Sequence, residues 1–132
     1  MTWIIPCNTS FFDVERAFDR LKCIDWKQSR NINTGDIIYI YVGCPIKAIL
    51  FKCRAVKVNM KKMEVDSSEY ILNGKVDKQY GNYMQLELIK KYDRTMLTLE
   101  ILNANGLQGS VQGPRRTNEQ LGILFAKVEK YS

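Results

Sequence analysis

Residues 35–58 read GDIIYIYVGCPIKAILFKCRAVKV, and this stretch decides the fold. Ile37–Val42 is a run of β-branched and aromatic residues, which favour strands. The short segment Gly43, Cys44 and Pro45 is typical of a turn, and residues 46–58 return as a second, longer strand. Two strand-like runs joined by a Gly- and Pro-containing turn predict an antiparallel β-hairpin.

The residues before the hairpin predict one strand, one helix and a loop. Residues 2–6 form a short apolar strand, and residues 11–22 place their apolar side chains on one helix face. Asn8, Thr9 and Ser10 are the candidates for the N-cap of this helix. Residues 25–34 show no periodicity, so we expect a loop there.

The residues after the hairpin predict a surface excursion, a strand and two helices. The excursion covers residues 61–81, and residues 83–89 alternate like a half-buried strand. Thr98 caps a short helix over residues 99–105, and Gly106 ends it in a left-handed conformation. After an irregular loop over residues 109–116, Thr117 and Gln120 form a capping box for the last helix.

This order of elements predicts an α+β domain with a small, curled antiparallel or mixed sheet that helices cover. The βαβ alternation of a Rossmann sheet is missing from the sequence. At 132 residues, we expect residues 1–132 to form a single domain.

The composition excludes several classes of protein. The chain has no histidine, which excludes a Ser-His-Asp triad, a Cys-His dyad and a two-histidine metal site. Its four cysteines contain no CxxC pair, so we expect buried reduced thiols, no metal and no cofactor. No apolar run approaches the ~20 residues that span a bilayer, and no signal peptide is visible, which favours a cytoplasmic protein without a membrane partner.

The charge favours a polyanionic partner. Lysine and arginine number 20 against 14 acidic residues, for a net charge of +6. Six basic residues and no acidic one lie between residues 47 and 62, among them Lys47, Lys52 and Arg54. They form either a surface that follows phosphates or a solvated strand face, and the sequence favours neither.

Two further stretches carry side chains suited to nucleic-acid recognition. Residues 25–32 place Trp26 beside Gln28, Ser29 and Asn31, and an aromatic ring with hydrogen-bonding neighbours suits an unstacked base. The alternative is a tryptophan that closes one end of the sheet. Residues 112–116 bring Arg115 and Arg116 before a helix N-terminus, as phosphate ligands or as solvated charges.

The tyrosines of the hairpin and the first tryptophan are further candidates. Tyr39 and Tyr41 share one face of their strand, which faces either solvent or a pocket. Trp3 is either a core residue or a pocket wall.

Three motifs together resemble the EVE domain of the PUA-like superfamily, which also contains YTH and ASCH modules. They are W-I-I-P-x-N at residues 3–8, W-x-x-S-R-N-I followed by G-D-I-I-Y-I-Y-V-G at residues 26–43, and Q-G-P-R-R at residues 112–116. The resemblance spans residues 2–125 and implies a β pseudobarrel of five to six strands with two to three packed helices. Only Ile32, Asn33 and Thr34 separate the R-N pair from G-D, where many family members carry a longer insert.

The resemblance also implies a pocket for a flipped, modified base and basic flanks on the phosphate backbone. By position, the pocket residues would be Asn8, Trp26, Ser29, Asn31, Tyr41, Gln112 and Pro114, with Trp3 as a further wall. The phosphate ligands would be Arg30, Lys47, Lys52, Arg54, Arg115 and Arg116. Gly35 and Asp36 are better interpreted as the turn that starts the strand.

Three functions stay open at this point. The favoured one is a non-catalytic module that binds DNA or RNA and works either with a separately encoded effector protein or by occupancy alone. The second is a small metal-independent ribonuclease of the ASCH type, with Lys47, Arg54, Tyr41 and Asp36 as possible catalytic groups. The ASCH-type pattern G-x-K-x-x-E-x-R is absent from the sequence. The third is a domain that binds a small ligand or a protein through the same pocket.

Overall fold

A computed structural model describes residues 1–72 and 82–131 of the chain. Its strands are β1 (Thr2–Cys7), β2 (Cys23–Lys27), β3 (Ile37–Val42), β4 (Ala48–Met60), β5 (Tyr83–Lys91) and β6 (Arg115–Arg116). Its helices are α1 (Val14–Arg20), the 3-10 turn η1 (Ser68–Tyr70), α2 (Leu99–Ala104) and α3 (Glu119–Tyr131). Within these described residues no helix has the length and apolar content to cross a membrane.

All six strands belong to one mixed sheet, in the order β2-β5-β4-β3-β1-β6. β1 and β3 run parallel to each other, and every other neighbouring pair is antiparallel. β4 pairs with β3 through its first half and with β5 along most of its length, and register shifts after Lys52 and Ala55 bend it. These bulges curl the sheet. The expected α+β fold with a curled mixed sheet is therefore confirmed, and the antiparallel pairing of β3 with β4 confirms the expected hairpin.

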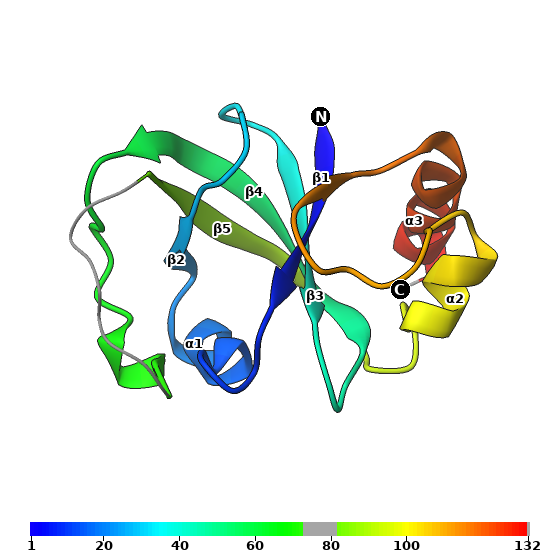
Figure 1. Cartoon of the computed structure of the whole chain (residues 1–132), viewed down its shortest axis with the longest axis horizontal. Coiled ribbons are helices and arrows are strands. Elements are labelled where there is room, and N and C mark those ends of the chain that lie inside the picture. Colours follow the sequence, from blue (N-terminus) through cyan, green and yellow to red (C-terminus); the bar gives the residue numbers. More distant parts are fainter. Residues whose placement is uncertain (73–81, 132) are drawn as a thin grey trace.

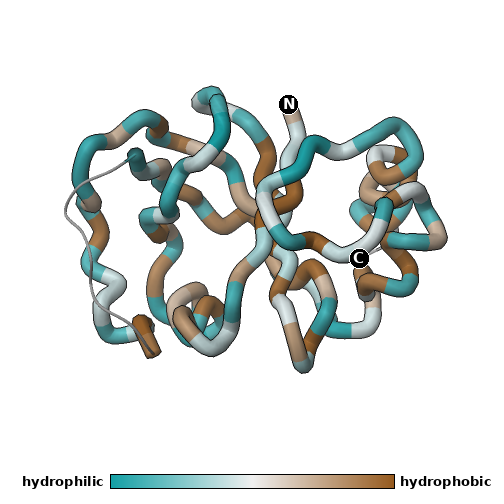
Figure 2. The backbone as a smooth tube through the Cα atoms, in the orientation of Figure 1, coloured by the Kyte–Doolittle hydropathy of each residue, from teal (hydrophilic) through white to brown (hydrophobic). Residues whose placement is uncertain are grey.

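The two faces of the sheet carry separate hydrophobic clusters because side chains alternate along each strand. Ile38 and Ile40 face the cluster that α1 covers. Tyr39 and Tyr41 face the opposite cluster, which α2 and α3 cover with Leu102, Leu121 and Phe125. Figure 1 shows α1 on one side of the sheet and the pair α2 and α3 on the other. In Figure 2 the hydrophobic segments concentrate along the strands and helices and the hydrophilic ones in the connections.

The helix ends confirm one predicted cap and correct two. Thr98 caps α2, because its hydroxyl accepts a hydrogen bond from Ile101 N at 3.2 Å, and Gly106 follows with φ 102. α1 is shorter than expected, and Asp13 caps it in place of the predicted polar triplet. α3 is capped by Asn118, whose Oδ1 accepts from Leu121 N at 2.9 Å, and not by the predicted Thr117. The Thr117 backbone instead continues the pairing of β6 by donating to Thr2 O at 3.1 Å.

The expected loop over residues 25–34 is wrong for its first part, where β2 pairs with β5. Its polar residue Asp25 is buried, and its carboxylate accepts hydrogen bonds from the backbone of Glu64 and Val65. This carboxylate ties the start of the surface excursion to β2. Residues 73–81, the last part of the expected excursion, lie outside the described residues.

Candidate functional site

A cleft of about 490 Å³ opens where β1 and β3 end. Parallel strands end at the same edge of a sheet, and here Gly43 N donates to Cys7 O at 3.1 Å. The segment after β1, the turn after β3 and the loop before β6 therefore meet around one opening. Its lining residues are Pro6, Cys7, Asn8, Thr9, Tyr41, Gly43, Cys44, Val111 and Gln112.

Side chains hold both walls of the cleft in place. On one side, the Thr9 hydroxyl donates to Cys44 O at 2.9 Å and ties the segment after β1 to the hairpin turn. On the other side, Asn103 Nδ2 donates to Leu107 O at 3.0 Å and to Gly109 O at 2.8 Å. The Arg115 guanidinium donates to Gln108 O and Ser110 O. These bonds fix the loop that presents Val111 and Gln112.

Three polar side chains of the lining have hydrogen-bonding capacity to spare. The Tyr41 hydroxyl has no hydrogen-bond partner among the described residues, although the residue is only 4% exposed. Asn8 Oδ1 accepts from the Ser10 backbone and hydroxyl, which leaves Asn8 Nδ2 as a donor. Gln112 Nε2 donates to Ser110 Oγ at 3.3 Å, which leaves Gln112 Oε1 as an acceptor. The cleft thus offers one donor, one acceptor and one hydroxyl.

The lining of this cleft is uncharged at neutral pH. Burial, assisted by the nearby Cys44, raises the pKa of the Tyr41 hydroxyl, so the phenol stays protonated. Burial also raises the pKa of the Cys7 thiol to about 12, with Asp13 adding to the effect. No Asp, Glu, Lys or Arg is among the lining residues. This environment suits a neutral, planar polar group better than a phosphate or a metal ion.

The structure brings together Asn8, Tyr41 and Gln112 of the eight predicted pocket residues and leaves the other five outside the cleft. Trp26 lies on β2, where its ring packs edge-on against Phe12 with centroids 5.8 Å apart. Ser29 and Asn31 are exposed on the segment after β2, and Pro114 precedes β6. The Trp26 ring is half-buried and packs against Phe12, so the described residues do not bring it together with Asn8, Tyr41 and Gln112, and a base pocket around Trp26 itself stays a prediction.

Trp3 is a core residue at the far end of β1 from Asn8. Five residues of strand separate them, which corresponds to roughly 16 Å. The Trp3 indole is 4% exposed and donates to Asp36 Oδ2 at 3.1 Å. The Arg116 guanidinium lies 5.3 Å from the centre of the Trp3 ring. Asp36 also accepts from Asn33 N, so it anchors the start of β3.

Three of the predicted phosphate ligands have partners within the fold. Lys52 pairs with Glu129 at 3.0 Å and Arg54 pairs with Glu87 at 3.0 Å. The Arg115 guanidinium holds the cleft loop. Phosphate binding by these three residues stays a prediction. Arg30 donates to Ser29 O and stays exposed, and Lys47 is exposed on the turn beside the cleft with φ 51.

Six cleft residues were missed by the sequence reasoning: Pro6, Cys7, Thr9, Gly43, Cys44 and Val111. The sequence signal for these residues is the turn at Gly43, which the sequence predicts as a turn but not as part of the lining of a cleft. Only the parallel pairing of β1 with β3 makes this turn a neighbour of Asn8. Metal ligation has no candidate cluster of three or more Cys, Asp or Glu side chains within residues 1–72 and 82–131.

Comparison with solved structures identifies similar folds at low sequence identity. A protein from Pseudomonas putida has a TM-score of 0.62 and 15% identity, and the match covers 97% of this chain and 99% of that chain. The ASCH protein from Zymomonas mobilis has a TM-score of 0.62 and 9% identity, with 96% and 94% of the two chains covered. A protein from Rhodopseudomonas palustris has a TM-score of 0.59 and 12% identity, with 98% and 93% covered.

The chain has the PUA-like fold of these ASCH structures. No protein-family model and no curated protein sequence matches the chain. The PUA-like part of the resemblance is thus confirmed at the level of the fold. The solved structures described above do not test membership in the EVE family, which stays a prediction.

Proposed function

We propose that the chain is a nucleic-acid-binding module that takes one unstacked base of a DNA or RNA strand into the cleft at Tyr41. The observation that carries this proposal is the convergence of a free hydroxyl, a free amide donor and a free amide acceptor in one uncharged cleft. These are the groups that recognise the edge of a base. The PUA-like fold and the basic net charge support the same partner.

The energetics favour a strand that is already single. Each neutral hydrogen bond contributes about 0.5–1.5 kcal/mol, while extruding a base from a duplex costs a few kcal/mol. The Tyr41 ring is buried, so it offers the base its hydroxyl and little stacking surface. A modification on the base would be selected by the shape of the cleft, because one added methylene contributes only about 0.8 kcal/mol. Such a module would act by occupying the strand or through a separately encoded effector protein.

The variant Tyr41→Phe tests the proposal, with Tyr70→Phe as the matched control. Tyr70 is a buried tyrosine on η1, outside the cleft lining. Binding is measured by calorimetry against short single-stranded RNA and DNA that differ in one modified base. We expect Tyr41→Phe to weaken binding about 2- to 13-fold, which corresponds to one hydrogen bond. Equal affinities for both variants and the unmodified chain would exclude the cleft as the base site.

A metal-independent ribonuclease is the second candidate, and one observation favours it. Lys47 adopts a left-handed backbone conformation, with φ 51, on the turn beside the cleft. Such a conformation is unfavourable for lysine, and strained residues cluster at functional sites. Lys47 could neutralise a phosphate next to the protonated Tyr41 hydroxyl. Asp36 and Arg54, the other two groups considered, are used in the anchor of β3 and in an ion pair.

Incubation of labelled RNA with the chain in the presence of a chelator separates the two candidates. Cleavage that is lost in Lys47→Ala and retained in Lys62→Ala would establish the ribonuclease. Intact RNA with retained binding supports the binding module. If neither RNA nor DNA binds, the cleft serves a small ligand or a protein.

A further inference from the structure

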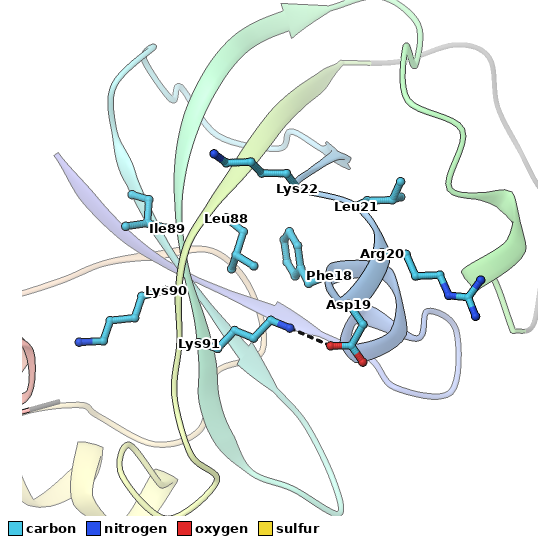
Figure 3. A pocket seen from close by; sticks show the side chains of 9 residues that line it. All are labelled: Phe18, Asp19, Arg20, Leu21, Lys22, Leu88, Ile89, Lys90 and Lys91. Atoms are coloured by element: carbon cyan, nitrogen blue, oxygen red, sulfur yellow. Dashed lines mark hydrogen bonds and ion pairs between the residues drawn. The ribbon is translucent and has the colours of Figure 1, made fainter.

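A second hollow lies between the end of α1 and the second half of β5, outside the cleft described above. Its volume is about 350 Å³, and its floor is apolar, with Phe18 from α1 and Leu88 from β5. Figure 3 shows these two side chains between the basic residues that surround them. Four of its lining residues are cations (Arg20, Lys22, Lys90 and Lys91), and Asp19 is its only carboxylate.

The carboxylates of α1 and of the adjacent η1 have specific partners, and Glu87 on β5 pairs with Arg54 at 3.0 Å. Asp19 pairs with Lys91 at 2.7 Å, and Glu15 on the same helix pairs with Arg94 at 3.1 Å. Glu69 pairs with Arg16 at 3.6 Å. Asp13, which directly precedes α1, is used as the cap of the helix.

Arg20 and Lys22, by contrast, have no carboxylate partner among the residues that the structure describes. Both are exposed. Lys90 extends away from these two residues, and its ammonium lies 5.6 Å from the centre of the Tyr92 ring (Figure 3). The surface around the hollow is therefore positive, with two cations available to a ligand.

The arrangement of these cations fits an extended polyanion better than a single phosphate. In Figure 3 Lys91 reaches toward Asp19, while Arg20 and Lys22 extend outward in different directions. Side chains that diverge cannot grip one phosphate, but they can each contact a different phosphate of one strand. At physiological salt, charges interact over about 8 Å, so only a strand that crosses this surface would sense them.

The hollow and the cleft lie near opposite ends of the same short helix. Asn8 and Thr9 of the cleft precede α1, Arg20 is its last residue, and Lys22 follows two residues later. α1 has seven residues, so it is only about 10 Å long. Single-stranded nucleic acids commonly occupy about 4–16 nucleotides on one small binding domain, so one strand can reach both places.

We infer that the surface formed by Arg20, Lys22 and the end of β5 binds the phosphate backbone of the nucleic-acid strand whose base enters the cleft. This inference rests on the proposed function, and it defines the path of the strand along α1. It predicts that the affinity for a short oligonucleotide, which fills only the cleft, does not depend on these cations. The affinity for a longer strand does depend on them.

The test compares the double variant Arg20→Ala/Lys22→Ala with the control Lys62→Ala/Lys127→Ala, which removes the same charge from two other exposed positions. The probes are a fluorescein-labelled single-stranded RNA of twelve nucleotides and an equally labelled dinucleotide, and the readout is anisotropy between 0.05 and 0.3 M KCl. Loss of two phosphate contacts lowers the slope of log K against log[salt] by about 1.4. The same loss weakens binding of the longer RNA about 25-fold at 0.1 M salt.

We expect this change only for Arg20→Ala/Lys22→Ala, only with the longer RNA, and with an unchanged midpoint of thermal unfolding. Equal slopes for the two double variants would overturn the inference. It would also be overturned if polyglutamate displaced the labelled RNA as well as unlabelled RNA does, because an acidic protein would then be the partner. Tyr41→Phe in the same assay separates the two proposals. If Tyr41→Phe weakens binding and the double variant does not, the proposal that a base enters the cleft is supported and the proposed phosphate-binding surface is wrong. The opposite result leaves the surface as a nucleic-acid contact and removes the base from the cleft.

Discussion

Replacement of Asp36 is the sharpest test of how the sheet is held together. Its side chain is 7% exposed, and its two oxygens have different partners. Oδ2 accepts from the Trp3 indole at 3.1 Å and from Asn33 N at 3.0 Å, and Oδ1 accepts from the amino group of Met1 at 3.1 Å. One carboxylate thus joins β1, the turn before β3 and β3 itself.

The geometry predicts different costs for two substitutions. Asp36→Ala leaves the buried indole N–H and the Asn33 amide without an acceptor, and each unsatisfied donor costs about 1–3 kcal/mol. We therefore expect Asp36→Ala to lower the free energy of unfolding by about 2–5 kcal/mol. Asp36→Asn can keep an oxygen at the position of Oδ2 and lose only the contact with the Met1 amino group, so we expect a loss of about 1 kcal/mol.

Urea unfolding followed by tryptophan fluorescence measures these values, because Trp3 lies in the bond that is removed. Asp93→Ala is the control, since its exposed carboxylate bonds to its sequence neighbours Thr95 and Arg94 and joins no distant parts of the fold. We expect that variant to lie within about 1 kcal/mol of the unmodified chain. If Asp36→Ala is as stable as Asp93→Ala, or if Asp36→Asn is no better than Asp36→Ala, the acceptor role of Oδ2 is wrong.

The same carboxylate gives a pH dependence with a definite sign. Burial by itself would raise the pKa of Asp36, but the bonds from Asn33 N, the Trp3 indole and the Met1 amino group outweigh it and hold the pKa below its usual value. The stability that the ionised group contributes is therefore complete above the unfolded pKa of about 4 and is lost as the pH falls through the lower folded value. Asp36→Asn lacks this component, so its deficit in stability should shrink on acidification below about pH 4.

The parts of the fold that were predictable are those determined by neighbouring residues. The β3–β4 hairpin follows from two β-rich runs and the turn at Gly43, and the cap at Thr98 follows from a short polar pattern. The apolar face of α3 was also predictable, because Leu121 and Phe125 repeat at helical spacing and pack on the sheet. β2 was missed because its Asp25 is buried by partners about 40 residues away in the sequence.

The candidate site was only partly predictable, for the same physical reason. Asn8, Tyr41 and Gln112 were found through the motifs that resemble the EVE domain, but the parallel pairing of β1 and β3 decides that they meet. Gln28 shows the opposite case. Its amide suggested a base contact in the sequence, yet it donates to Asn59 Oδ1 and accepts from Asn59 N, 31 residues away. A polar side chain in a sequence does not reveal whether its partner is a ligand or a distant backbone group.

Three substitutions test the helices that cover the sheet and the hydroxyl of the cleft. Gly106→Ala should destabilise the fold by about 1–3 kcal/mol, because φ is +102 and the new Cβ would lie 2.7 Å from Gln120 Oε1. Gly113→Ala, whose Cβ would meet nothing within 4 Å, should change stability by less than about 0.5 kcal/mol in the same urea titration. Tyr92→Phe removes a hydroxyl that donates to Glu129 on α3 at 2.8 Å, so we expect a loss of about 1 kcal/mol. Tyr41→Phe removes a hydroxyl without a partner in the described fold and should leave the free energy of unfolding unchanged while it weakens ligand binding. A larger loss of stability in Tyr41→Phe than in Tyr92→Phe would mean that the Tyr41 hydroxyl is bonded within the protein, and the cleft would then lack the group on which its binding function depends.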